Sequence, residues 1–144
     1  NKYPQPGAGL VDESAELLEH DHAMIRANAV GLLGDIAPEY QRHVAVHIPS
    51  IATCLTDADT TVRRNASIAL VECGKADPEA IREQSDQLEA ALADDQREVR
   101  KNASVLIGNA QPAVSPEPLH QLADEDPDAE VRELAEWAVD QVNS

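Results

Sequence analysis

The sequence reads Val62-Arg63-Arg64-Asn65-Ala66 near its middle, and this segment decides the fold because its pattern recurs. The same spacing of apolar residue, arginine, asparagine or leucine, and alanine returns in three other segments: Ile25-Arg26-Ala27-Asn28-Ala29, Val99-Arg100-Lys101-Asn102-Ala103 and Val131-Arg132-Glu133-Leu134-Ala135. The first three copies are 37 residues apart and the fourth follows after 32. Such a period indicates stacked units, each too small to bury its own apolar face.

The repeated segment is expected to begin the second of two antiparallel helices in each repeat. From Val62, apolar residues recur at Ala66, Ala69, Leu70 and Cys73, which lie on one stripe of a helix. The second helices are predicted at 23–36, 60–75, 97–110 and 129–142. The first helices are predicted at 10–20, 39–56, 79–93 and 116–123.

The predicted fold is therefore all-α, a solenoid of about four helix pairs. Pro49 is expected to bend the first helix of the second repeat, or to split it after His47, because proline cannot continue a helix ladder. Residues 1–9, rich in proline and glycine, are predicted to be a leader or linker before a repeat domain at 10–144. The repeats are placed at about 10–37, 38–77, 78–112 and 113–142.

Composition restricts the setting and the partners. The chain has 144 residues with 27 acidic and 11 basic side chains, for a formal net charge of −16. Phosphate binding needs clustered cations, so this charge argues against nucleic acid and anionic membranes as partners. Little lysine and much aspartate resemble the composition of haloarchaeal proteins that work in high salt, and an ordinary acidic scaffold is the alternative.

The expected location is the cytoplasm. The sequence has no apolar stretch near the ~20 residues of a membrane helix and no secretory leader. Its two cysteines, Cys54 and Cys73, form neither a disulfide framework nor a metal motif. The chain begins without methionine, so an excerpt of a longer protein is expected to be possible.

The recurring arginine is expected to be structural. It sits one position after a core residue, where its guanidinium can reach an acidic turn of its own or the next repeat and bind a carboxylate in bidentate fashion. The predicted ladder between repeats consists of Arg26, Arg63, Arg100 and Arg132 with Asp57, Asp94 and Asp126.

These motifs resemble HEAT repeats, including the short HEAT-like variety, over about residues 10–142. The resemblance rests on units of the form D-x-D-x-x-V-R-x-N-A followed by an apolar pair and glycine. It implies a right-handed superhelix whose second helices line the concave side, with an Asp–Arg ladder between repeats. It also implies that capping repeats depart from the pattern, as Leu134 does in the fourth copy. Short HEAT-like repeats also occur in bilin-lyase-type proteins and in a class of DNA glycosylases.

A partner-binding surface is predicted on the concave face of the second helices. Its residues are the cations Arg64 and Lys101, the amides Asn65 and Asn102, and the apolar Ile68 and Val105. The cations could equally well only relieve repulsion, and the asparagine column is more simply explained by hydrogen bonds between repeats than by contacts with a peptide backbone. The expected partner is another protein, in particular an acidic or extended peptide. The oligomeric state is left open.

No catalytic constellation, metal site or cofactor is predicted. His43 and His47, four residues apart on one expected helix after Glu39, could share a metal, but no further ligand motif accompanies them. Trp137 is expected to seal the end of the stack, to pack against a further repeat, or to extend an apolar strip on the concave face. The predicted function is a non-enzymatic protein-interaction scaffold. A bilin-lyase-type enzyme or ligand-binding protein, or a spacer in a larger chain, is the alternative.

Overall fold

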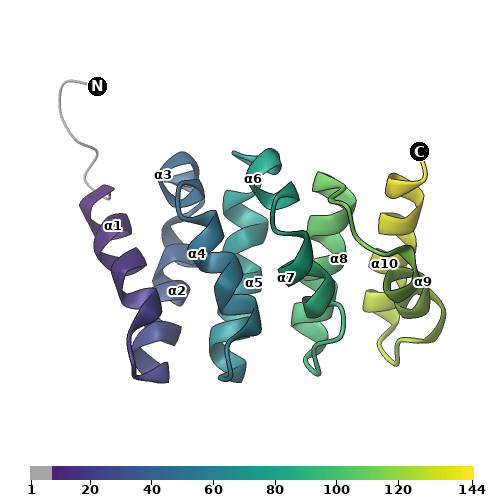
Figure 1. Cartoon of the computed structure of the whole chain (residues 1–144), viewed down its shortest axis with the longest axis horizontal. Coiled ribbons are helices and arrows are strands. Elements are labelled where there is room, and N and C mark those ends of the chain that lie inside the picture. The colour runs from purple at the N-terminus through teal and green to yellow at the C-terminus, as the bar shows by residue number, and fades with distance from the viewer. Residues whose placement is uncertain (1–7) are drawn as a thin grey trace.

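The computed structural model describes residues 8–144, and within them the chain forms helices in two layers with no strand (Figure 1). The layer at the back of Figure 1 consists of four parallel helices of 14 residues each: α2 (Ala23–Ile36), α5 (Thr60–Cys73), α8 (Arg97–Ala110) and α10 (Ala129–Val142). These second helices lie where the sequence predicts them, except that α5 ends two residues before the expected 75. The chain is therefore an α-solenoid.

The front layer is built from shorter pieces. They are α1 (Ala8–Glu16) with the 3-10 turn η1 (Leu17–Glu19), α3 (Gln41–Ala45), α4 (Ile48–Thr53) with η2 (Cys54–Thr56), α6 (Pro78–Arg82), α7 (Ser85–Ala91) and α9 (Pro116–Glu125). Of the leader predicted for residues 1–9, residues 1–7 lie outside the described part, and α1 begins at Ala8. Described residues include no helix long and apolar enough to cross a bilayer.

The expected break in the second repeat is confirmed. The long helix predicted at 39–56 is interrupted after Ala45, and α4 restarts at Ile48 with Pro49 in its first turn, where a missing N–H costs nothing. The helix predicted at 79–93 is also broken, between Arg82 and Ser85, although no proline lies there. That second break was not expected from the sequence.

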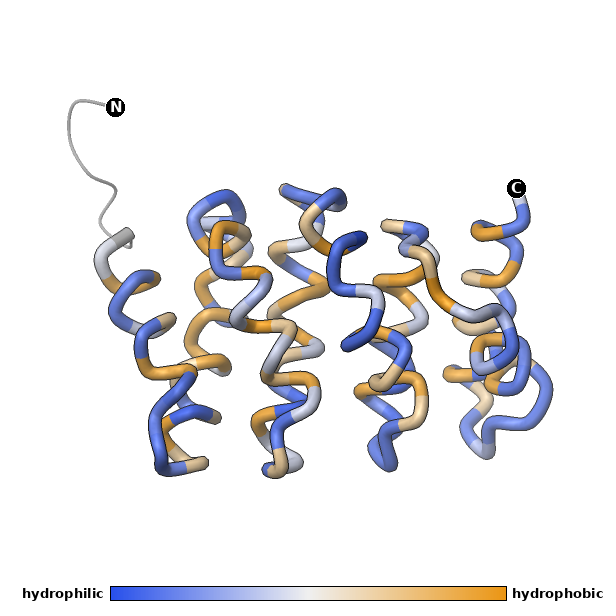
Figure 2. The backbone as a smooth tube through the Cα atoms, in the orientation of Figure 1, coloured by the Kyte–Doolittle hydropathy of each residue, from blue (hydrophilic) through white to orange (hydrophobic). Residues whose placement is uncertain are grey.

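Small residues set the spacing between second helices. Ala66, Ala103 and Ala135 occupy one column of the repeat and are buried. A Cβ built on Gly34 would lie 3.6 Å from the Cα of Ala69, so α2 and α5 approach with little between their backbones. The apolar residues alternate with polar ones along every helix, as expected for a stack whose core runs between the layers (Figure 2).

The last repeat departs from the others. An extended connector over residues 111–115 starts with Gln111 in the left-handed region, at φ 53°, and leads into the single helix α9. Trp137 on α10 packs against Gly108 on α8, and a side chain at position 108 would clash with the indole. Trp137 thus points back at the preceding repeat.

Candidate protein-interaction site

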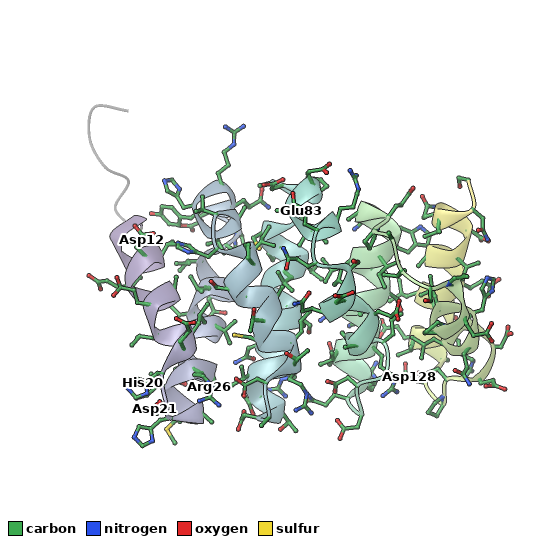
Figure 3. All side chains as sticks on the ribbon, viewed as in Figure 1. Asp12, His20, Asp21, Arg26, Glu83 and Asp128 are labelled. Atoms are coloured by element: carbon green, nitrogen blue, oxygen red, sulfur yellow. The ribbon has the colours of Figure 1, made fainter. Side chains whose placement is uncertain are left out.

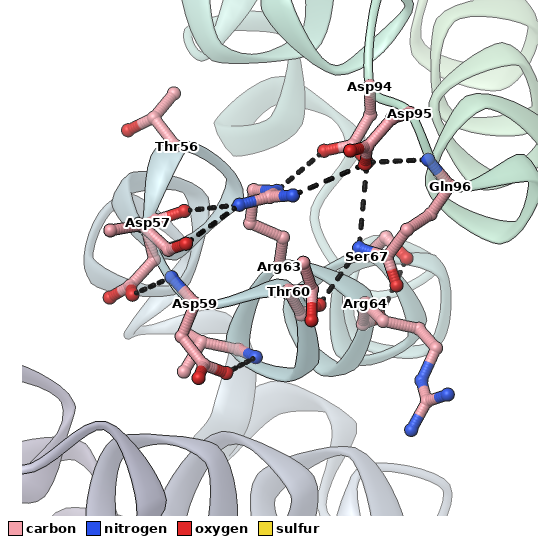
Figure 4. Close-up of polar contacts among 12 residues, drawn as sticks. Thr56, Asp57, Asp59, Thr60, Arg63, Arg64, Ser67, Asp94, Asp95 and Gln96 are labelled. Atoms are coloured by element: carbon pink, nitrogen blue, oxygen red, sulfur yellow. Dashed lines mark hydrogen bonds and ion pairs between the residues drawn. The ribbon is translucent and has the colours of Figure 1, made fainter.

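An arginine in each of the first three repeats joins two turns. Arg63 donates from Nε to Asp94 Oδ2 at 2.7 Å in the next repeat, and from Nη1 to the carbonyl oxygen of Asp57 at 2.8 Å in its own turn (Figure 4). Asp95 Oδ1 lies 3.4 Å from the Nη2 of the same guanidinium. One planar group therefore fixes both the turn that starts α5 and the turn that starts α8.

The same arrangement recurs on both sides of Arg63. Arg26 binds Asp57 through Nε and Nη2 at 2.8 and 3.0 Å, and Arg100 binds Asp126 through the same atoms at 2.7 and 3.2 Å. Arg132, in the last repeat, donates only to the carbonyl oxygen of Asp126, at 2.6 Å. In residues 8–144 three arginines of this column thus contact carboxylates of the following repeat.

Two carboxylates of this ladder, Asp57 and Asp126, are held in their ionised form. Burial by itself would raise the pKa of Asp126, but the hydrogen bonds from Arg100 and from the N–H of Asp128 outweigh it, so the pKa lies below its usual value. The pKa of Asp57 is lowered against burial in the same way, by Arg26 and by the N–H of Asp59. Each aspartate therefore closes its own turn and also accepts from the preceding repeat.

Two members of the asparagine column, Asn65 and Asn102, form hydrogen bonds to the preceding repeat, whereas Asn28 is exposed. Asn65 donates from Nδ2 to the carbonyl oxygen of Ala27 at 3.0 Å. Asn102 is buried and donates to Ser67 Oγ, also at 3.0 Å. Both amide nitrogens predicted to contact a partner are thus used between repeats, which was the simpler of the two interpretations of this column.

Two other predicted contact residues lie on the outer face of α5. Arg64 is exposed, and its guanidinium points away from the ladder without an ion pair to any described residue (Figure 4). Ile68, one turn further along, is 43% exposed. Val105 and Trp137 occupy the same column of the repeat on α8 and α10, and both are partly exposed. We call the set Arg64, Ile68, Val105 and Trp137 the second-helix stripe.

Lys101 is placed differently from its sequence counterpart Arg64. Its Nζ lies 3.3 Å from Glu98 Oε2 and 3.8 Å from Glu130 Oε1, so its charge is already matched by carboxylates. The positive charge predicted at this position is therefore paired within the chain, because Glu98 lies one turn before Lys101 on the same helix.

An ion-pair cluster around Arg97 was missed from the sequence. Arg97 binds Asp128 at 2.8 Å and Glu130 at 2.9 Å, which connects the start of α8 to the start of α10 at the lower right of the molecule (Figure 3). The pKa of Arg97 is raised, mainly by its hydrogen bond to Asp128. Arg97 precedes the repeated segment and has no arginine at the matching position of the other repeats, so the period gave no signal.

The histidine pair does not form a shared site. His43 lies on α3 with its ring edge against Tyr40, at a centroid distance of 6.0 Å. His47 lies between α3 and α4, and its Nε2 is 3.0 Å from Asp12 Oδ1 on α1 (Figure 3). The expectation that both lie on one continuous helix is wrong, because that helix is interrupted between them.

The two thiols are buried in the second repeat. Burial raises the pKa of Cys54 to about 11 and that of Cys73 to about 12. A thiol with such a pKa is protonated and unreactive at neutral pH. Among the described residues, every fully buried side-chain nitrogen and oxygen also has a hydrogen-bond partner. The fully buried polar atoms of the described residues therefore need no further partner. Groups that could contact another molecule lie on the surface.

The stacked helix pairs, the column of small residues and the ladder between turns define a HEAT-repeat α-solenoid. Residues 24–125 match the sequence model of Cnd1, described as non-SMC mitotic condensation complex subunit 1. This match covers most of the chain, which therefore belongs to that family. No curated protein sequence matches it.

Similar solved structures include engineered proteins and a designed repeat protein. One engineered protein aligns with a TM-score of 0.81 at 23% identity, over 94% of this chain and 38% of its own length. A second aligns with a TM-score of 0.77 at 23% identity, over 93% of this chain and 64% of its own. A designed armadillo repeat protein, in complex with the peptide (KR)4, aligns with a TM-score of 0.75 at 21% identity, over 94% and 65%. The chain spans less than two thirds of the length of each of them.

Proposed function

We propose that this chain is a non-enzymatic scaffold that binds another protein along the second-helix stripe. The observation that carries the proposal is the exposed pair Arg64 and Ile68 on α5, one charged and one apolar. Neither side chain has a role in the stacking of the repeats. The neighbouring residues of the repeated motif on α5 have structural contacts. Arg63 belongs to the ladder, Asn65 donates to α2, and Ala66 is buried in the core. Residues left outside such a pattern are available for contact.

The proposed partner segment is an extended peptide. The stripe continues from Ile68 to Val105 and Trp137 on successive helices, so an extended chain crossing them would meet one apolar position per repeat. The family is described as a subunit of a complex, and one designed structural neighbour is in complex with a peptide. Both descriptions are consistent with a scaffold of this kind.

We further propose that an acidic residue of the partner lies opposite Arg64. Lys101 contributes less to such recognition, because Glu98 and Glu130 already neutralise it. The protein has a formal net charge of −16. In this setting, one free guanidinium beside an apolar side chain would determine the register of the bound segment more than it would raise the binding affinity.

The test is affinity capture from cells of the source, comparing the wild type with Arg64→Glu/Ile68→Glu. The chain offers a matched control in Arg42→Glu/Val46→Glu. This variant changes an exposed arginine and an exposed aliphatic residue, four positions apart, in the front layer. A partner retained by the wild type and by the control, but lost by the stripe variant, supports the proposal.

Two results contradict it. Equal loss in both variants would show that added negative charge, and not the stripe, governs binding. Retention of every partner by the stripe variant would remove the second-helix stripe from the interface, although the chain could still bind elsewhere. The melting temperature of both variants should be measured first, since exposed substitutions are expected to change stability by no more than about 0.5 kcal/mol.

A further inference from the structure

A groove lies between α7 and α9 in the front layer, away from the second-helix stripe. Its volume is about 470 Å³, within the range of sites that enclose a ligand or a large side chain. Ala93, just after α7, forms one wall with the buried Leu92 beneath it, and Pro118 and Leu122 of α9 form the other.

The groove has a register equivalent at the other end of the stack. A second cavity, of about 230 Å³, is lined by Leu18, Glu19, Pro49, Thr53 and Asp57. Leu18 and Leu92 are two periods of 37 residues apart, and the segment from Pro49 to Asp57 matches the segment from 118 to 126 in length and position. Equivalent cavities thus occur at both ends of the stack, and the C-terminal one is the larger.

The C-terminal copy is the more apolar of the two. Leu122 replaces Thr53, and Ala93 replaces Glu19, so two polar positions of the N-terminal copy become apolar. Pro127 adds a further apolar contact at the turn before α10. These replacements leave an apolar cleft that water solvates poorly and that an apolar side chain would fill favourably.

Carboxylates lie at the rim of the groove, and the arginine at its floor is already hydrogen-bonded. Asp95 and Glu125 line the groove and are exposed. At the floor, Arg100 is bound to Asp126 and to the carbonyl oxygen of Asp94, so its donors are in use. An incoming group thus meets negative charge at the edge and apolar surface inside, with no cation free to attract an anion.

We propose that this groove docks a partner segment in which an apolar side chain is followed directly by arginine or lysine. The apolar side chain lies between Ala93 and Leu122, above the buried Leu92, and the cation lies against Glu125 and against Asp95, whose Oδ1 also lies 3.4 Å from Arg63 Nη2. This proposal does not depend on the second-helix stripe, because the two helices that border the groove belong to the front layer (Figure 1).

The probe is the blocked peptide Leu-Arg-Leu-Arg, titrated into methyl-labelled protein while the leucine and isoleucine methyl resonances are followed by NMR. Saturating shifts at Leu92 and Leu122, with Ile68 unmoved, are expected. The blocked peptide Ser-Arg-Ser-Arg reports charge alone, and Leu-Glu-Leu-Glu reports apolar contact without complementary charge. Each is expected to bind at least tenfold more weakly than the probe.

The matched variants are Ala93→Arg, which places a long cation in the groove, and Glu19→Arg, the equivalent change in the N-terminal copy. Both positions are exposed, so neither change is expected to unfold the chain. Affinity for the probe should fall at least tenfold in Ala93→Arg and change less than twofold in Glu19→Arg. Equal binding of Ser-Arg-Ser-Arg, an unchanged affinity in Ala93→Arg, or the absence of saturating shifts at Leu92 and Leu122 at millimolar probe would each overturn the proposal.

Discussion

Arg100 on α8 holds Asp126, in the turn before α10, through two hydrogen bonds of 2.7 and 3.2 Å, and the Asp126 side chain is only 2% exposed. Removing one partner of a buried ion pair leaves the other charge uncompensated and costs about 3–5 kcal/mol. Because Arg100 keeps 13% exposure and a backbone acceptor, we expect Asp126→Asn to lower the free energy of unfolding by about 3 kcal/mol. Urea denaturation at neutral pH measures this loss.

Asp124→Asn is the control for that substitution. Asp124 lies two residues away on α9, is exposed, and is outside the ladder. Its replacement should change stability by no more than about 0.5 kcal/mol. Similar losses in the two variants would mean that Asp126 acts through net charge and not through its contact with Arg100.

The ladder also predicts how stability depends on acid. The pKa values of Asp57 and Asp126 are lowered in the folded chain, so the unfolded state takes up protons first as the pH falls. Their contribution is complete above the unfolded pKa of about 3.9 and is lost as the pH falls through the lower folded values. The stability difference between wild type and Asp126→Asn should therefore be constant above about pH 5 and shrink below about pH 4.

Comparing the two proteins isolates the ladder from a second effect of acid. Protonation of exposed carboxylates relieves the repulsion of a chain with net charge −16, and this effect is common to both proteins. A stability difference that stays constant down to pH 2 would contradict the assignment of the lowered pKa to the contact with Arg100.

The buried thiols make a prediction about chemical reactivity. With pKa values raised to about 11 and about 12, Cys54 and Cys73 should resist iodoacetamide in the folded chain at pH 8 and react fully in denaturant. The raised values also mean that the unfolded state loses its thiol protons first, so stability should decrease as the pH rises above about 9. Mass spectrometry of labelled protein checks the first point, and rapid alkylation of either cysteine without unfolding would refute it.

The sequence predicted the architecture because the period repeats one physical requirement four times. Each second helix needs an apolar start, a small residue at Ala66 or its equivalents, and an arginine at its edge, and the structure places all three accordingly. Contacts outside the period could not be found in this way. Lys101 shares a column with Arg64, yet its surroundings differ because Glu98 and Glu130 belong to its own and the next repeat.

The interruption between α6 and α7 shows a second limit of the sequence. Proline marked the equivalent break before Pro49, but the segment Glu83-Gln84 carries no residue that excludes a helix. No local pattern therefore reports the break. The groove between α7 and α9 was missed for the same reason, since its walls come from residues far apart in the chain.

Salt should stabilise this chain if its charge acts by self-repulsion. The Debye length falls from about 10 Å at 0.1 M to about 3 Å at 1 M, so repulsion among the exposed carboxylates is largely screened in molar KCl. We expect the melting temperature to rise across this range and to approach a plateau, as in a protein adapted to high salt. Choline chloride at matched ionic strength is the control for screening, and a flat response to both salts would contradict the halophilic interpretation of the composition.

Trp137 and Gly108 give the sharpest packing test. A Cβ at position 108 would meet the indole ring, whose atoms belong to a rigid side chain packed between α8 and α10, so Gly108→Ala is expected to destabilise the fold by about 1–3 kcal/mol. Gly34→Ala is the matched control, because a Cβ there lies 3.6 Å from Ala69, an ordinary contact, and alanine is the better helix former by about 0.8–1 kcal/mol. The two substitutions should therefore change stability in opposite directions. Trp137 is the only tryptophan in the chain, so its fluorescence should change in Gly108→Ala and not in Gly34→Ala. Equal stability of the two variants would show that the indole can move aside, and that Trp137 does not fix the angle between the last two repeats.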